Sequence, residues 1–86
     1  MEILIVEDDV HINNLLAEAL SKACYTCVQA FSGSEALLLC ERREFSLILL
    51  DLMLPGCSGY DVCRVIRDKT DVPILMVTAR TESVDK

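Results

Sequence analysis

Three short aliphatic runs constrain the fold of this 86-residue chain more than any other feature. Each run is four residues long, and together they cover Ile3 to Val6, Leu47 to Leu50 and Ile74 to Val77. Runs of this length favour strands over helices. Because they lack the alternation of apolar and polar residues seen in one-sided strands, we expect a parallel sheet with helices on both faces. Tyr25 to Ala30 is a weaker fourth strand.

The segments between these runs are expected to form helices, because apolar residues recur in them at three- and four-residue steps. The predicted helices cover Val10 to Ala23, Ser34 to Arg43 and Tyr60 to Asp68, and Thr81 to Lys86 resembles the first turn of another. Asp9 and Ser34 are the expected N-caps. The residues predicted to face the sheet are Ile12, Leu15, Leu16, Ala19, Leu20, Leu37, Leu38, Cys40, Val62, Cys63, Val65 and Ile66. The pattern predicts one α/β domain over residues 1–86.

The composition and the charge exclude several classes of protein. With 52% hydrophobic and 26% charged residues, the chain has the composition of a packed globular domain. Its 14 acidic and 8 basic residues give a net charge of -6, which disfavours direct binding to nucleic acid. No apolar run approaches the roughly 18 residues that span a membrane, and the first residues lack the basic character of a signal peptide. We therefore expect a cytoplasmic protein without a membrane partner.

The five cysteines are an odd number in a chain without an export signal, which favours reduced thiols over a disulfide framework. Cys24 and Cys27 have the spacing of a redox pair or of half a zinc site. The chain has no second such pair, and His11 is its only histidine. We therefore interpret the cysteines as small buried hydrophobic residues.

Acidic residues and a hydroxyl group follow three of the predicted strands. Glu7, Asp8 and Asp9 come after the first strand, Asp51 after the third and Thr78 after the fourth. Parallel sheets with right-handed crossovers bind ligands outside the carboxyl ends of their strands, so these side chains should share one rim. Crowded carboxylates favour a cation among them, and oxygen ligands suit Mg²⁺. Alternatively they are solvated residues or helix caps, an interpretation that we accept for Asp9 and that is weaker for Asp51, whose neighbours are apolar.

At these positions the sequence resembles the receiver domains of two-component response regulators. The resemblance covers all 86 residues and rests on Ile3 to Asp9, Leu49 to Gly56, Ser58-Gly59 and Pro73 to Ala79. It implies a doubly wound parallel sheet, the flavodoxin-like receiver fold, with four strands in the order 2-1-3-4, three helices and the start of a fourth. It also implies that the fold is incomplete, because the family's fifth strand and the lysine that ends it would follow Lys86.

The resemblance implies a role for each residue at the rim. Asp51 would accept the phosphoryl group, and Thr78 would donate a hydrogen bond to one phosphoryl oxygen. Mg²⁺ would be bound by Asp8, Asp51 and the backbone carbonyl of Met53, and Glu7 would act through a water molecule.

The resemblance also implies the partners. A sensor histidine kinase would supply the phosphoryl group, and the receiver would promote its own phosphorylation and dephosphorylation without being an enzyme. Met53 and Arg80 stand where family members vary the lifetime of the phosphoaspartate. The sequence is most similar to regulators with a C-terminal winged-helix domain, so DNA would be contacted only through an effector domain absent from this chain. The open edge at Pro73 to Thr78 predicts a dimer or a strand-exchanged oligomer.

Two alternative functions remain to be weighed. An aspartyl-phosphate hydrolase of the haloacid-dehalogenase type would also use Asp51 as nucleophile, but it needs a second aspartate where Met53 stands. A degenerate receiver would serve only protein contacts, and the complete set of acidic residues together with Thr78 argues against it.

Overall fold

The computed structural model describes residues 2–52, 54 and 58–77. In chain order the elements are β1 (Glu2–Val6), α1 (Val10–Lys22), β2 (Thr26–Ala30), α2 (Gly33–Arg42), β3 (Leu47–Asp51), α3 (Gly59–Lys69) and β4 (Ile74–Val77). All four predicted strands and all three predicted helices are present, with ends that differ by at most one residue from the predicted ones. The helical turn expected at Thr81 to Lys86 lies outside the described residues.

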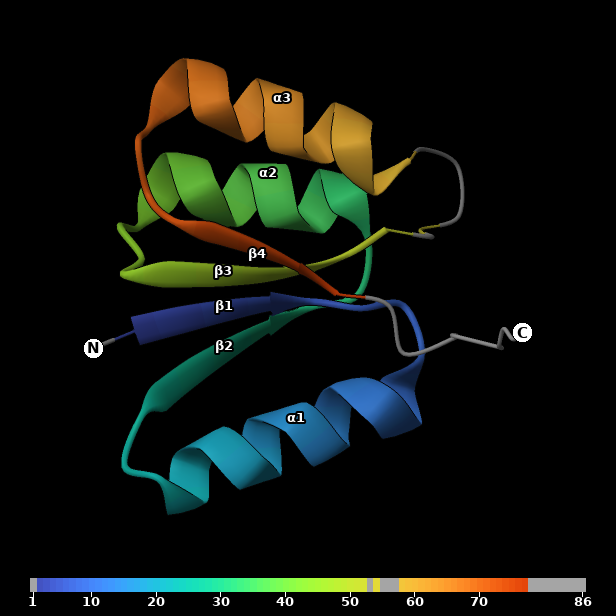
Figure 1. Cartoon of the computed structure of the whole chain (residues 1–86), viewed down its shortest axis with the longest axis vertical. Helices are drawn as coiled ribbons and strands as arrows, with labels where there is room; N and C mark the ends of the chain where they lie inside the picture. The colour runs from blue at the N-terminus through green and yellow to red at the C-terminus, as the bar shows by residue number, and fades with distance from the viewer. Residues whose placement is uncertain (1, 53, 55–57, 78–86) are drawn as a thin grey trace.

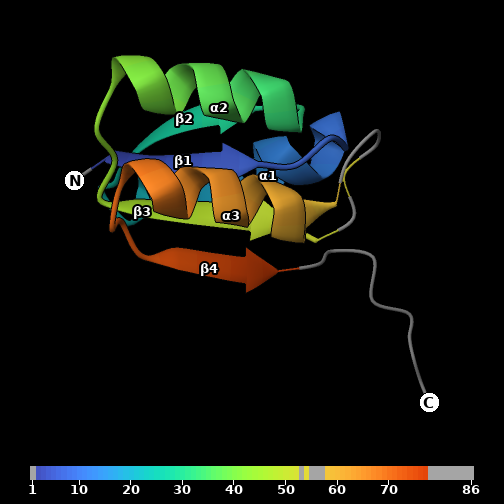
Figure 2. The ribbon, with the colours of Figure 1, turned by 90° about the horizontal axis from the view of Figure 1, so that it is seen from above.

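The four strands form one parallel sheet in the order β2-β1-β3-β4, as the sequence predicts (Figure 1). Helix α1 covers one face, and α2 and α3 lie together on the other (Figure 2). Each strand except the first therefore follows a helix that crosses the sheet, and all the strands end at the same rim. In the register of the sheet, Val6 lies between Ala30 and Leu50, and Asp51 pairs with Val77.

The aliphatic runs are buried on both faces of the sheet, which explains why they do not alternate with polar residues. Four consecutive residues of β1, from Ile3 to Val6, are buried. The main core lies between the sheet and the two helices α2 and α3. Its buried residues are Leu4, Val6, Ala30, Ala36, Ile48, Leu50, Leu54, Val62 and Ile66.

The inward face of α1 differs from the prediction. Leu15 is 53% exposed and Ala19 is exposed, whereas Asn13 is completely buried. The buried and half-buried positions of this helix are Ile12, Asn13, Leu16, Ala17 and Leu20. The prediction followed apolar residues alone, and it therefore passed over a polar residue that belongs to the inward face.

Helices α2 and α3 also correct details of the prediction. Ser32, not Ser34, caps α2, because its hydroxyl accepts a hydrogen bond from the amide of Glu35. The Glu35 carboxylate in turn accepts from the amide of Phe31, an arrangement close to a capping box. Leu38 in α2 and Val65 in α3 were expected to face the sheet, but they are 50% and 39% exposed. They lie at the margins of the apolar stripes, where one residue turns a helix by about 100°.

The cysteines are less buried than predicted. Cys27, Cys40 and Cys63 are half-buried and Cys24 is exposed, while Cys57 lies outside the described residues. Cys24 has a φ of 73°, in the left-handed region that favours glycine. It follows the C-cap of α1, and its amide donates to the carbonyl of Ser21, while the next amide donates to Leu20. This is a Schellman motif with cysteine in the place of glycine.

Candidate functional site

The carboxyl ends of β1 and β3 bring three acidic residues together. Val6 pairs with Leu50 in the sheet, so Glu7, Asp8 and Asp51 follow at the same rim. Each of the three offers a carboxylate oxygen, and these oxygens lie within 4.8 Å of one another. Asp51 is completely buried, Glu7 is buried and Asp8 is half-buried. The predicted convergence of these residues is therefore confirmed.

The backbone and the side chain of Glu7 each make a hydrogen bond that holds the residue in place. Its amide donates to the carbonyl of Ala30 at the end of β2, at 3.0 Å. Its carboxylate accepts from the amide of Asp9, at 2.9 Å. Asp9 caps α1 by accepting from the amide of Ile12, at 3.0 Å. The interpretation of Asp9 as a helix cap is thus confirmed, and this cap starts α1 directly after the acidic pair.

Asn13 connects α1 to the ends of two strands. Its side-chain nitrogen Nδ2 donates to the carbonyls of Glu7 and Ala30, both at 3.0 Å. Its oxygen Oδ1 accepts from Nε2 of Gln29 in β2, at 2.9 Å, and the same Nε2 also lies 2.8 Å from Oδ1 of Asn14. Asn13 was not among the predicted site residues, although its spacing from Leu16 and Leu20 places it on the inward stripe.

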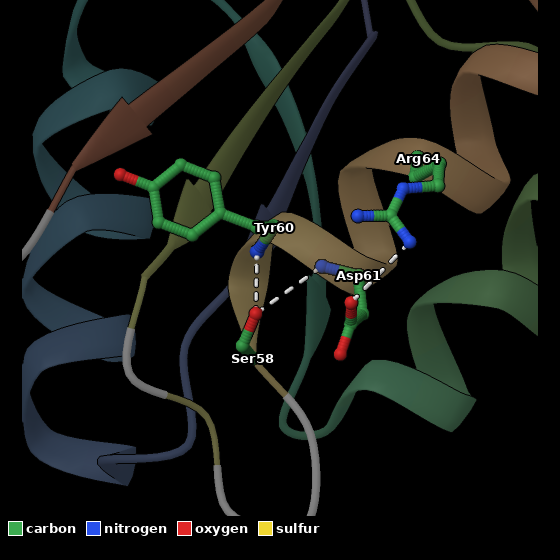
Figure 3. A network of polar contacts seen from close by, with 4 residues as sticks. All are labelled: Ser58, Tyr60, Asp61 and Arg64. Atoms are coloured by element: carbon green, nitrogen blue, oxygen red, sulfur yellow. Dashed lines mark hydrogen bonds and ion pairs between the residues drawn. The ribbon is translucent and has the colours of Figure 1, made fainter.

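The other side of the rim is closed by the start of α3. The hydroxyl of Ser58 caps this helix by accepting from the amides of Tyr60 and Asp61, at 3.1 and 3.3 Å (Figure 3). The amide of Gly59 donates to the carbonyl of Leu52, at 3.0 Å. A Cβ atom on Gly59 would overlap the Asp51 carbonyl oxygen and would lie 2.8 Å from Cα of Leu52. Only glycine lets α3 begin this close to the end of β3.

The acidic cluster has the chemistry of a site for a hard divalent cation. Among the described residues its ligands are carboxylates, which are the donors that Mg²⁺ prefers, and no histidine or cysteine joins them. Three carboxylates in a mostly buried position repel one another, and a cation offsets that repulsion. The residues present therefore fit Mg²⁺. Thr78 and Met53, which are also predicted at this rim, lie outside the described residues, as does Arg80.

A cavity of about 720 Å³ lies at the opposite end of the sheet, between the ends of α2 and α3 and the start of β4. Its wall carries charges of both signs, including the ion pair between Glu41 and Lys69, at 2.8 Å. The hydrogen bond from Lys69 lowers the pKa of the Glu41 carboxyl. The acidic cluster is not part of this cavity, so the chemistry of the rim and not the volume of the cavity marks the candidate site.

The comparisons with known proteins agree with this fold. The model of the response regulator receiver domain family matches residues 3–86. The transcriptional regulatory protein YrkP of Bacillus subtilis is 45% identical over 84 residues, which are 98% of this chain and 36% of that protein. RegX3 of Mycolicibacterium smegmatis is 44% identical over 98% of this chain and 37% of its own length.

Solved structures show the same similarity. The response regulator TrrA of Thermotoga maritima, in complex with Mg²⁺-BeF, is 37% identical, with a TM-score of 0.87 over 93% of this chain and 70% of that chain. The chain therefore belongs to the response regulator receiver domain family of two-component systems. It spans a little over a third of the length of YrkP and of RegX3. YrkP and ResD of Bacillus subtilis are transcriptional regulatory proteins, as the resemblance implies.

None of the helices in the described part of the chain has the length and apolar character needed to cross a membrane.

Proposed function

We propose that Asp51 accepts a phosphoryl group from the phosphohistidine of a sensor histidine kinase, beside a bound Mg²⁺. The observation that carries this proposal is the burial of Asp51 at the end of β3, with oxygens of Glu7 and Asp8 within 4.8 Å of it. Mg²⁺ would be held by Asp8, Asp51 and the backbone carbonyl of Met53, and Glu7 would act through a water molecule. The complex of TrrA with Mg²⁺-BeF supports Mg²⁺ as the cation.

The Asp51 carboxylate acts as the nucleophile. One of its oxygens forms a bond to phosphorus while the bond from phosphorus to the donor nitrogen breaks, and the imidazole leaves with the electron pair. A cation held by Asp8 and Asp51 would offset the negative charge that gathers on the oxygens of the transferred group. Thr78 donates a hydrogen bond to one of these oxygens. The receiver in this way promotes its own phosphorylation, and attack of water on the aspartyl phosphate reverses it.

The added phosphoryl group switches an output domain of the protein that carries this chain. Phosphorylation adds negative charge and acceptor oxygens at the rim, and Thr78 moves to meet them. The names of YrkP and ResD, both transcriptional regulatory proteins, support transcription as the output, through DNA contacts made by a domain outside these residues. We place the reaction in the cytoplasm.

Phosphorylation with a small-molecule donor tests this function. The protein that carries this chain is incubated with radiolabelled acetyl phosphate, with Mg²⁺ or with a chelator. We expect an alkali-labile label that needs Mg²⁺, is lost in Asp51→Asn and is kept in Asp68→Asn, which changes an exposed aspartate of α3 in the same way. An equal label in Asp51→Asn would identify another acceptor. No label in the wild-type protein would favour a receiver that serves only protein contacts.

A further inference from the structure

Asn13 is a polar side chain in the most buried position of α1, where the neighbouring inward positions are apolar. A buried amide is stable there only if its donors and acceptor have partners. Both hydrogens of Nδ2 have a carbonyl acceptor, and Oδ1 has the amide of Gln29. Because the two carbonyls can only accept, they fix which end of the Asn13 amide faces the sheet.

The two carbonyls that accept from Asn13 belong to Glu7 and Ala30, which lie where the pairing of β1 and β2 ends. Glu7 donates its amide to Ala30, and Asn13 then takes the carbonyls of both residues. The backbone of Glu7 is therefore held on both sides of Cα, the atom that bears its side chain. Asp8 follows directly, so the position of Asn13 sets where both carboxylates meet Asp51.

We propose that Asn13 is a positioning residue for the acidic pair, which it holds in place through the backbone carbonyl of Glu7. The proposal rests on the proposed Mg²⁺ site, and it assigns to that site a side chain that does not touch the cation. Without the two hydrogen bonds from Nδ2 of Asn13, the mutual repulsion of the carboxylates moves them apart, and the cation loses its preformed ligands. Residues that orient metal ligands in this indirect way typically change metal affinity by about 10- to 100-fold.

Gln29 in β2 belongs to the same hydrogen-bond network as Asn13. Its Nε2 donates to Oδ1 of Asn13 and to Oδ1 of Asn14, and so it holds the Asn13 amide in the orientation that the carbonyls require. Gln29→Leu removes this donor but leaves Asn13 in place. We therefore expect Gln29→Leu to weaken cation binding in the same direction as a change of Asn13, but less.

Titration calorimetry with Mg²⁺ on the protein that carries this chain tests the proposal. Asn13→Leu keeps the branched shape and the number of non-hydrogen atoms and removes the amide, and Ser21→Leu places leucine at an exposed position in the last turn of the same helix. We expect the Kd for Mg²⁺ to rise about 10- to 100-fold in Asn13→Leu and to stay within about twofold in Ser21→Leu. The Mg²⁺ concentration that gives half-maximal labelling by acetyl phosphate should shift by the same factor, while the rate at saturating Mg²⁺ changes much less.

The outcomes separate positioning from folding. A purely structural role would lower the fraction of binding-competent protein, and so the number of sites in the titration, without changing the Kd. That result, or a wild-type Kd in both Asn13→Leu and Gln29→Leu, would overturn the role of Asn13 while leaving the proposed function intact. A wild-type protein that binds no Mg²⁺ would overturn the proposed cation site itself and this inference with it.

Discussion

The amide of Gly59 lies 3.0 Å from the carbonyl oxygen of Leu52, so the first turn of α3 rests directly on the backbone that follows Asp51. The contact leaves no room for a side chain at position 59, because a Cβ there would lie 2.8 Å from Cα of Leu52 and would overlap the carbonyl of Asp51. This backbone contact thus fixes the start of α3 next to Asp51, the proposed phosphoacceptor.

Gly59→Ala is expected to lower both stability and phosphorylation. The methyl group meets backbone atoms that cannot turn away, so α3 or the end of β3 must shift, at a cost of about 1–3 kcal/mol in the free energy of unfolding. Urea unfolding measures the stability, and labelling by acetyl phosphate measures the effect on Asp51. Asp68→Ala, at an exposed position of the same helix, should change neither. A wild-type unfolding midpoint and label in Gly59→Ala would show that the contact yields without cost.

Ser58→Ala is expected to destabilise the domain through the start of α3 (Figure 3). The change removes the hydroxyl that accepts from the amides of Tyr60 and Asp61, which costs about 0.5–2 kcal/mol for a typical N-cap. Ser58→Asp keeps an acceptor and should recover most of the loss in thermal or urea unfolding. Equal stability of the alanine and aspartate variants would argue against a capping role.

Cys24→Gly is expected to stabilise the domain by about 1 kcal/mol, because glycine adopts the left-handed conformation without the steric penalty of a Cβ atom. Cys24→Ala is the matched control, since it removes the thiol but keeps the Cβ atom. Comparison of their unfolding midpoints measures the contribution of the backbone alone. If both variants gain equally, the thiol and not the φ angle is the source of the effect.

The thiols of Cys24 and Cys40 should react at different rates. Burial raises the pKa of the Cys40 thiol, and the nearby charge of Lys69 lowers it again in part, whereas Cys24 is exposed. Because the thiolate is the reactive form, alkylation of Cys40 should need a higher pH than an ordinary thiol. Lys69→Gln should slow it further. Peptide mass spectrometry after brief iodoacetamide treatment gives both rates, and faster labelling of Cys40 at neutral pH would contradict this order.

The sequence by itself determined the sheet and the place of its chemistry. Short aliphatic runs that end in acidic residues can be buried only as inner strands, and right-handed crossovers make such strands parallel. Glu7, Asp8 and Asp51 must then meet at one rim, because each directly follows or ends a buried run. This convergence depends on chain order and handedness alone, so it could be predicted without any knowledge of side-chain contacts.

The sequence also contained a local signal that was read incorrectly. Ser32 and Glu35 have the spacing of a capping box, but Ser34 was taken as the cap of α2. Helix faces were predicted less well than helix ends. Leu15, Leu38 and Val65 are apolar and lie at helical spacing, and yet they are at least one-third exposed.

Only the tertiary structure decided the burial of Asn13 and the need for glycine at position 59. Nδ2 of Asn13 donates to backbone carbonyls at the ends of β1 and β2, and the steric limit at Gly59 comes from the backbone of Asp51 and Leu52. Backbone atoms are the same in every residue, so the sequence does not mark which of them a side chain will meet. These contacts form only when α1 and α3 pack on the sheet, because packing fixes the rotation of each helix about its axis.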